Sequence, residues 1–375
     1  MKLKLRWMPE MIGRGVDRNV GARMRQLTSA AIISHNIYCE ERYGTTDGAR
    51  IAILRSPLGS PQEELWVCDL RTWEVACLSK SIIGCPTSNL YRDTLFYIRP
   101  VGSSGRVLVR VDLKTLDEDE IFDLSKCPDS RWPVCTISPD ERYFVCNMRV
   151  AGNIWGLYRV DLQQGIWEVF HEHVDICNPH PQFEPSKGND ILVQLNRGSV
   201  IDDEGNIIRL VGEEEATLYL IDRNGGNLRP LPVGKPYTWG VTGHECWIAD
   251  TGKIILTISD PLRGAVHIVT PGDAVSRCLW RGLGFAHISA SSDGRYFVCD
   301  DFSNGRIYVG SIHSGRLLPL CDSGATVSLP QYTHPHPYMT PDNRYVIFNS
   351  DSTGLGQVWA AEIPKGFLEA LDDPL

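Results

Sequence analysis

The sequence of 375 residues predicts an all-β fold, a single seven-bladed β-propeller spanning residues 1–375. Two observations predict this fold class. A turn, a strand-like run, a loop and a second strand-like run form a unit that occurs seven times. The first turns lie at Asp47, Asp93, Asp140 and Lys187, in steps of 46, 47 and 47 residues, which suits four-stranded propeller blades. A pair of β-sandwiches would not explain seven similar units.

The two strand-like runs of each unit are marked by alternating apolar residues, β-branched residues and aromatics. The first runs are residues 49–54, 94–98, 142–147, 190–195, 253–258, 295–300 and 344–349. The second runs are residues 64–68, 106–111, 155–160, 217–221, 265–269, 306–310 and 357–363. We expect each pair of runs to lie in one blade.

The repeat is irregular in two places. A step of 64 residues separates Lys187 from the turn at Thr251, and the excess is the polar stretch 199–216, which we interpret as a loop insertion in blade four. The last unit ends near Ile363, too early to supply its own outer strand. The N-terminal segment 23–28 resembles the outer-strand ends of other units, so we expect it to complete blade seven and close the ring, which removes exposed sheet edges.

Composition favours a soluble globular protein, with 42% hydrophobic and 22% charged residues. A formal net charge of -9 lacks the basic footprint of a nucleic-acid binder. The N-terminus has no sustained apolar run, and no stretch approaches the ~20 apolar residues of a membrane-spanning helix. We therefore expect a cytoplasmic protein without a nucleic-acid or membrane partner. Its 12 cysteines follow no Cys-x-x-Cys pattern and are expected to be reduced core thiols.

Four of the ten histidines occupy nearly the same position in consecutive units. His180, His244, His287 and His336 lie six or seven residues before a turn. In a propeller, the strand before that turn is the innermost strand of the blade, and it starts at one mouth of the central channel. Equivalent positions therefore converge, and several imidazoles around one axis form a metal site or an acid–base cluster.

A fifth histidine belongs to the same cluster. His334 and His336 are separated by one residue, so on an extended strand both side chains point to the same side, which permits chelation of one ion. The other five histidines are interpreted as structural residues. Trp239, Tyr332 and Trp247 flank the histidine segments, and they either stack on sugar rings or pack in the core.

The segment Gln-Tyr-Thr-His-Pro-His-Pro at residues 331–337 resembles the metal-binding segment of the oligogalacturonate lyase family. The segment Thr-Gly-His-Glu-Cys-Trp at residues 242–247 is similar to the family's His-Glu-Phe-Trp segment, which contains its catalytic histidine. The resemblance spans nearly the whole chain and is strongest in blades five to seven. It implies an intracellular seven-bladed propeller that cleaves pectin-derived oligouronides by β-elimination.

The resemblance also implies roles for individual residues. Those implied to hold a divalent metal, manganese in the family, are His287, Gln331, His334 and His336. His244 is implied to be the Brønsted base that removes the proton α to a uronate carboxylate, since a histidine titrating near neutral pH can accept it. A cation on that carboxylate stabilises the enolate-like charge. Candidates for contact with the acidic oligosaccharide are His180, Arg197 and Tyr332.

Blade four departs from the family pattern. The family's Cys-His-Glu-Gly-Pro segment is replaced in this chain by residues 194–198, Gln-Leu-Asn-Arg-Gly, and a family arginine implicated in catalysis falls at Thr217. Arg197 either replaces the lost positive charge or caps a strand end at the surface. Two alternatives therefore stay open: a metal-dependent enzyme acting on another, oxidised glycoside, and a noncatalytic binding propeller of the TolB-like or WD-like kind. Sequence indicates neither the exact substrate nor the oligomeric state.

Overall fold

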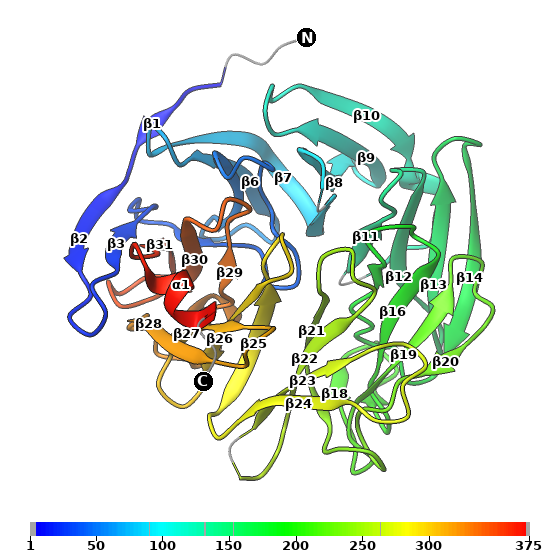
Figure 1. Ribbon diagram of the computed structural model, residues 1–375. Coiled ribbons are helices and arrows are strands. Elements are labelled where there is room, and N and C mark those ends of the chain that lie inside the picture. Colours follow the sequence, from blue (N-terminus) through cyan, green and yellow to red (C-terminus); the bar gives the residue numbers. More distant parts are fainter. Residues whose placement is uncertain (1–4, 90, 131–132, 153, 263, 373–375) are drawn as a thin grey trace.

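The computed structural model describes residues 5–89, 91–130, 133–152, 154–262 and 264–372, which form β-sheets arranged as blades around a central axis (Figure 1). This confirms the predicted all-β propeller. Blade one contains β4 (Ile33–His35), β5 (Arg50–Ser56), β6 (Glu63–Asp69) and the first part of β7 (Glu74–Ser88), with β1 (Met8–Pro9) at its edge. Blade two contains the rest of β7, β8 (Thr94–Val101), β9 (Gly105–Asp112), β10 (Glu118–Asp123) and the short helix η1 (Leu124–Lys126).

The next three blades have four strands each in the described chain. Blade three contains β11 (Cys135–Ile137), β12 (Tyr143–Ala151), β13 (Ile154–Asp161) and β14 (Ile166–His173). Blade four contains β15 (Gln182–Phe183), β16 (Asp190–Leu195), β19 (Thr217–Asp222) and β20 (Arg229–Pro230). Blade five contains β21 (Val241–Trp247), β22 (Ile254–Ile258), β23 (Ala265–Val269) and β24 (Arg277–Arg281).

The last two blades bring the chain back to its beginning. Blade six contains β25 (Phe285–Ala290), β26 (Tyr296–Asp301), β27 (Arg306–Ser311) and β28 (Leu317–Asp322). Blade seven contains β29 (Tyr338–Met339), β30 (Tyr345–Ser350), β31 (Gln357–Glu362), β3 (Arg23–Gln26) and β2 (Ile12–Val16). In this sheet β3 pairs antiparallel with β31, with Arg23 opposite Glu362 and Gln26 opposite Trp359. The first and last segments of the chain therefore share one blade.

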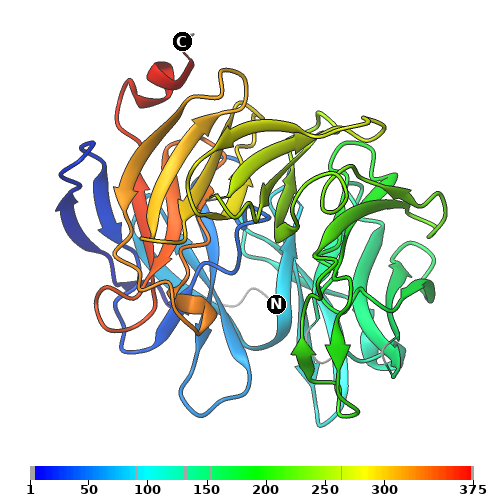
Figure 2. The same cartoon turned by 90° about the horizontal axis from the view of Figure 1, so that it is seen from below.

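Residues 199–216 contain a hairpin that forms a sheet of its own, β17 (Val200–Ile201) with β18 (Ile207–Arg209). Figure 2 shows this green hairpin on the lower side of the molecule, where the orange helix η2 (Gln331–Thr333) also lies. The C-terminal helix α1 (Phe367–Asp372), in red, lies on the upper side. The insertion and the segment that carries Gln331 thus share one side of the propeller.

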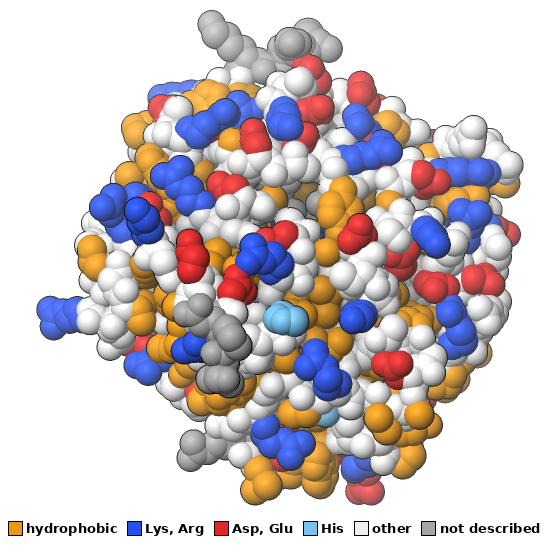
Figure 3. Space-filling view, in the orientation of Figure 1, with side chains coloured by type: hydrophobic (Ala, Val, Ile, Leu, Met, Phe, Trp, Pro, Cys, Tyr) orange, Lys and Arg blue, Asp and Glu red, His pale blue; other side chains and the backbone are white. Residues whose placement is uncertain are grey.

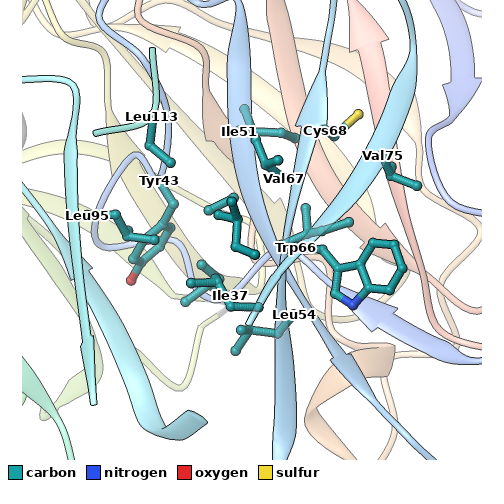
Figure 4. Close-up of a cluster of buried hydrophobic side chains, with 14 of the residues drawn as sticks. Ile37, Tyr43, Ile51, Leu54, Trp66, Val67, Cys68, Val75, Leu95 and Leu113 are labelled. Carbon is teal, nitrogen blue, oxygen red and sulfur yellow. The ribbon is translucent and has the colours of Figure 1, made fainter. Parts of the chain in front are cut away.

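Apolar side chains between neighbouring blades form the core. One cluster joins blades seven, one and two, and Figure 4 shows Ile51 and Leu54 of blade one near Leu95 of blade two. Burying each such side chain contributes about 2 kcal/mol relative to exposure. This packing holds adjacent blades in register and fixes where their inner strands begin. All twelve cysteines are free, and most are buried as predicted, but Cys85 and Cys278 are exposed and do not belong to the core.

Blade one differs from the other blades along its inner strand. His35 lies opposite Leu54, and pairing resumes only at Gly44, opposite Ile51. The intervening residues 36–42, named the axial bulge, run into the central channel. The bulge contacts blade seven through the main-chain N–H of Asn36, which donates to Asn349 Oδ1 at 2.8 Å, and blade six through Arg42, which donates to the Ala290 carbonyl at 2.8 Å.

Figure 3 shows Lys and Arg side chains interspersed with Asp and Glu on the face that carries α1. This mixed face has no extended basic surface of the kind that tracks a nucleic-acid backbone. Within the part of the chain that the structure describes, every helix is too short or too polar to cross a membrane.

Candidate metal centre

The inner strands of blades four to seven bring their histidines to the channel. His244 lies within β21 and His287 within β25, whereas His180 and His336 each lie two residues before β15 and β29. These strands are the innermost of their blades, so their starts surround the axis. The convergence expected from the sequence spacing is present for His244, His287 and His336.

These three histidines form a compact cluster, named the histidine trio. One ring nitrogen of each lies within 4.8 Å of one from the others, a spacing at which all three can hold one ion. The ring centroids of His287 lie 4.3 Å from His244 and 4.1 Å from His336. His334 is outside this trio, with its centroid 5.4 Å from His287 and 5.7 Å from His336.

A pocket of about 500 Å³ opens above the cluster. Its lining includes His244, His287, His334 and Gln331, together with the aromatic ring of Phe302. Gln331 is exposed at the start of η2 and lines the pocket from that segment. Three of the residues implied to bind metal, His287, Gln331 and His334, thus line one pocket, and His244, the implied base, lies within ligand distance of His287 and His336.

The surroundings of His244, His334 and His336 favour neutral imidazoles that can bind a metal ion. His244 Nδ1, His334 Nδ1 and His336 Nε2 are buried and have no hydrogen-bond partner among the described residues. Burial, followed by the neighbouring His287 imidazole, holds the pKa of His244 and of His336 well below the usual range and lowers the pKa of His334. Unprotonated nitrogens without partners fit a divalent cation of borderline softness, together with an amide oxygen from Gln331.

Asp300 orients the central histidine. One carboxylate oxygen accepts a hydrogen bond from the His287 main-chain N–H at 2.8 Å, and the other accepts from His287 Nδ1 at 2.7 Å. Because a carboxylate only accepts, Nδ1 carries the proton and Nε2 keeps its lone pair for a ligand. Sequence reasoning gave Asp300 no role. The available signal was an acidic residue inside the apolar run Tyr-Phe-Val-Cys-Asp at residues 296–300.

Tyr38 of the axial bulge forms the floor of the cluster. Its ring centroid lies 4.7 Å from His336, 5.7 Å from His244 and 5.6 Å from His180. The tyrosine therefore separates His180 from the trio. Sequence reasoning gave Tyr38 no role either, although the extra residues between His35 and the turn at Asp47 mark an unusual inner strand.

His180 takes part in a buried ion pair behind Tyr38. Its Nδ1 lies 2.5 Å from Glu40 Oε1, and the adjacent Glu245 is completely buried. Burial opposes protonation of His180, but the carboxylates of Glu40 and Glu245 outweigh this and raise its pKa to about 9. Burial and the neighbouring Glu40 raise the pKa of Glu245 to about 8. His180 does not line the pocket, so this structure gives no support for its expected contact with substrate.

The other two candidates for substrate contact also lie away from the pocket lining. Arg197 donates to the carbonyl oxygens of Glu215 at 2.8 Å and Lys235 at 3.0 Å, and to that of Glu214. Its guanidinium thus ties the insertion to the loop before β21. The ring of Tyr332 packs against Gly356, where any added Cβ would meet it at 2.5 Å.

The two tryptophans near the histidine segments differ in their environment. Trp247 is buried and its indole N–H donates to the Gln182 carbonyl at 3.2 Å, so it belongs to the core. Trp239 is 45% exposed. Of these two side chains, only Trp239 is available for contact with a ligand.

Fold and site together define a β-propeller with a histidine cluster, a candidate metal centre, at the start of its inner strands. No protein-family model matches the chain. The sequence is similar to that of the oligogalacturonate lyase of Dickeya dadantii (strain 3937), at 23% identity over 93% of this chain and 95% of that protein. It is 22% identical to the oligogalacturonide lyase of Pectobacterium atrosepticum, with the same coverage. These relatives confirm the resemblance predicted from the sequence.

Solved structures confirm the fold. An oligogalacturonate lyase from Vibrio parahaemolyticus superposes with a TM-score of 0.75 and 20% identity, covering 97% of this chain and all of that one. An oligogalacturonate lyase in complex with manganese gives 0.73 and 21%, covering 98% of this chain and all of the other. The β-propeller domain of the Trilobed protease from Pyrococcus furiosus gives 0.50 and 15%, with coverage of 85% and 98%.

Proposed function

We propose that this protein is a metal-dependent lyase that cleaves oligogalacturonate or a related uronic-acid glycoside by β-elimination. The observation that carries the proposal is the convergence of three imidazoles, two from implied metal ligands and one from the implied base, within 4.8 Å beneath an open pocket. The relatives named as oligogalacturonate lyases support the reaction class, and the solved oligogalacturonate lyase in complex with manganese supports manganese as the metal.

His287 and His336 belong both to the histidine trio and to the set of ligands that the family resemblance implies. His287 offers Nε2 because Asp300 occupies its Nδ1, and His336 offers an Nε2 that has no other partner among the described residues. Gln331 and His334 line the same pocket and supply further ligands. A divalent cation bound there would neutralise the uronate carboxylate and acidify the adjacent C–H bond.

His244 is the proposed base. Burial keeps its imidazole neutral, and its unpartnered Nδ1 is available to accept the proton α to the carboxylate. As the proton moves to His244, the C–H electron pair forms the carbon–carbon double bond and the bond to the glycosidic oxygen breaks. The electron pair of that bond leaves on the oxygen, which takes up a proton from solvent.

The residues expected to contact substrate differ from the family pattern, which supports a second candidate function: a metal-dependent enzyme acting on another acidic or oxidised glycoside. The described residues that line the pocket include no Lys or Arg. At the position of the family arginine, Thr217 bonds through its hydroxyl to the Val233 carbonyl within blade four. Attraction of an acidic sugar to this pocket therefore depends on the metal.

The test is the ultraviolet absorbance of unsaturated product from oligogalacturonates of defined length, with and without manganese. We expect product that requires the metal and is lost in His244→Ala. His171→Ala is the matched control, because His171 bonds Tyr219 of the neighbouring blade at 2.7 Å, outside the cluster. Absence of product from every uronide, with manganese bound, would contradict the lyase proposal.

A further inference from the structure

A second hollow, named the blade-five hollow, adjoins the metal pocket. It measures about 670 Å³ and shares Ile258 and Asp260 with the lining of the metal pocket, so the two lie next to each other on blade five. One wall is the loop 232–239 that precedes β21. The opposite wall includes Leu262 from the loop after β22 and Arg281 at the end of β24.

The wall formed by the loop 232–239 presents aromatic rings to solvent. Tyr237 is 58% exposed and Trp239 is 45% exposed. The loop is nevertheless well fixed, because the Tyr237 N–H donates to the Gly234 carbonyl at 2.9 Å and Thr238 Oγ1 accepts from the Gly234 N–H at 2.7 Å. Arg197 adds its bond to the Lys235 carbonyl. The loop thus holds the apolar faces of these rings in water at a fixed place, as a stacking platform requires.

Cationic groups border the same hollow. Lys235 Nζ lies over one face of the Trp239 ring, 5.8 Å from its centroid, so a sugar stacked on the opposite face would have the ammonium group across the ring. Lys235 and Arg281 each lie 3.4 Å from one carboxylate oxygen, those of Glu215 and Asp260, and Lys235 also donates to the Glu213 carbonyl at 2.8 Å. The two cationic side chains are 46% and 55% exposed, so a ligand carboxylate can approach each from the solvent side.

We propose that the blade-five hollow binds sugar units of an acidic oligosaccharide beyond the two units that flank the cleaved bond. The proposal rests on the proposed function for its ligand, an oligouronide whose reacting units lie at the histidines. Aromatic rings receive the C–H faces of the sugar, and Lys235 and Arg281 receive its carboxylates. The hollow therefore makes the enzyme prefer longer oligouronides.

Chain-length kinetics test this proposal. We expect Trp239→Ala to raise KM for a tetragalacturonate about tenfold, the loss of one stacking contact, with kcat unchanged. KM for a digalacturonate should stay at the wild-type value, since that ligand does not reach the hollow. Trp167→Ala is the matched control, because Trp167 is 38% exposed on β14, away from both pockets. Equal chain-length preference in Trp239→Ala and wild type would overturn the proposal.

Calorimetric binding separates failure of this proposal from failure of the proposed function. Tetragalacturonate and a neutral tetrasaccharide of the same length are titrated into wild type, Trp239→Ala and Arg281→Gln, with circular dichroism as the check on folding. Binding of tetragalacturonate that weakens about tenfold in folded Trp239→Ala supports the hollow even if no product forms. Equal affinity of the wild type for the neutral sugar, or no effect of Arg281→Gln, overturns the assignment to an acidic ligand.

Discussion

Replacing Asp300 by Asn should weaken metal binding at the histidine trio. Asp300 accepts two hydrogen bonds from His287, one on each carboxylate oxygen, at 2.8 and 2.7 Å. An asparagine has a single acceptor oxygen. Either the buried main-chain N–H of His287 loses its acceptor, or the new NH2 group faces Nδ1 and moves the imidazole proton to Nε2, which blocks the proposed ligand atom.

The expected size of the effect follows from the role of such orienting groups. Their removal costs about 10- to 100-fold in metal affinity, equivalent to about 1.4 to 2.7 kcal/mol. Isothermal titration of manganese into wild type and Asp300→Asn measures it directly. Both proteins should be folded, which circular dichroism checks before titration.

Asp301→Asn is the matched control for this experiment. Asp301 is also buried, but its oxygens accept from the Ser303 N–H at 3.0 Å and from Asn304 Nδ2 at 3.2 Å, within a turn. We expect this variant to lose stability while keeping the wild-type affinity for manganese. Unchanged affinity in Asp300→Asn, or an equal loss in both variants, would refute the assignment of Asp300 as the group that orients His287.

Three further predictions follow from neighbouring contacts. Burial raises the pKa of Glu41 to about 7, so this carboxyl stabilises the fold most below its ordinary pKa of 4.5 and progressively less as pH rises to 7. Urea unfolding should therefore show a smaller fall in stability over that range in Glu41→Gln than in wild type. Tyr38→Ala should lower manganese affinity about tenfold by removing the ring against His336, whereas Tyr38→Phe should keep it, as titration will check. Arg197→Ala should speed amide hydrogen exchange in residues 197–240 without changing KM for a digalacturonate, which does not reach the blade-five hollow; a raised KM for the digalacturonate with unchanged exchange would instead assign Arg197 to substrate.

The blades were predictable because each buries a period-two pattern against its neighbours. The predicted run 94–98 lies inside β8 and the run 217–221 inside β19, as packing on both faces of a blade demands. The continuity of β7 was not predictable. It pairs with β6 through Ile82 and with β8 from Ile83, and nothing in local composition marks a strand that serves two blades.

The position of the histidines was predictable because repeat spacing converts directly into position around the axis. Their individual environments were not. His180 shares the register of the trio, yet the bulge places Tyr38 between them, and Glu40 from the same bulge pairs with His180. The bulge interrupts the repeat at one blade only, so repeat spacing carries no information on which side chains it inserts into the channel. The role of Asp300 was not predicted for a similar reason, because the pairing between strands decides that its carboxylate contacts His287.

The most direct test of the metal centre is the metal content of the purified protein after exposure to manganese, compared with His336→Ala and the control His171→Ala. His336 belongs to the histidine trio, whereas His171 bonds Tyr219 away from the channel. We predict near-stoichiometric manganese in wild type and His171→Ala and its loss in His336→Ala. Manganese absent from wild type, or retained in full by folded His336→Ala, would contradict a metal centre built on these histidines.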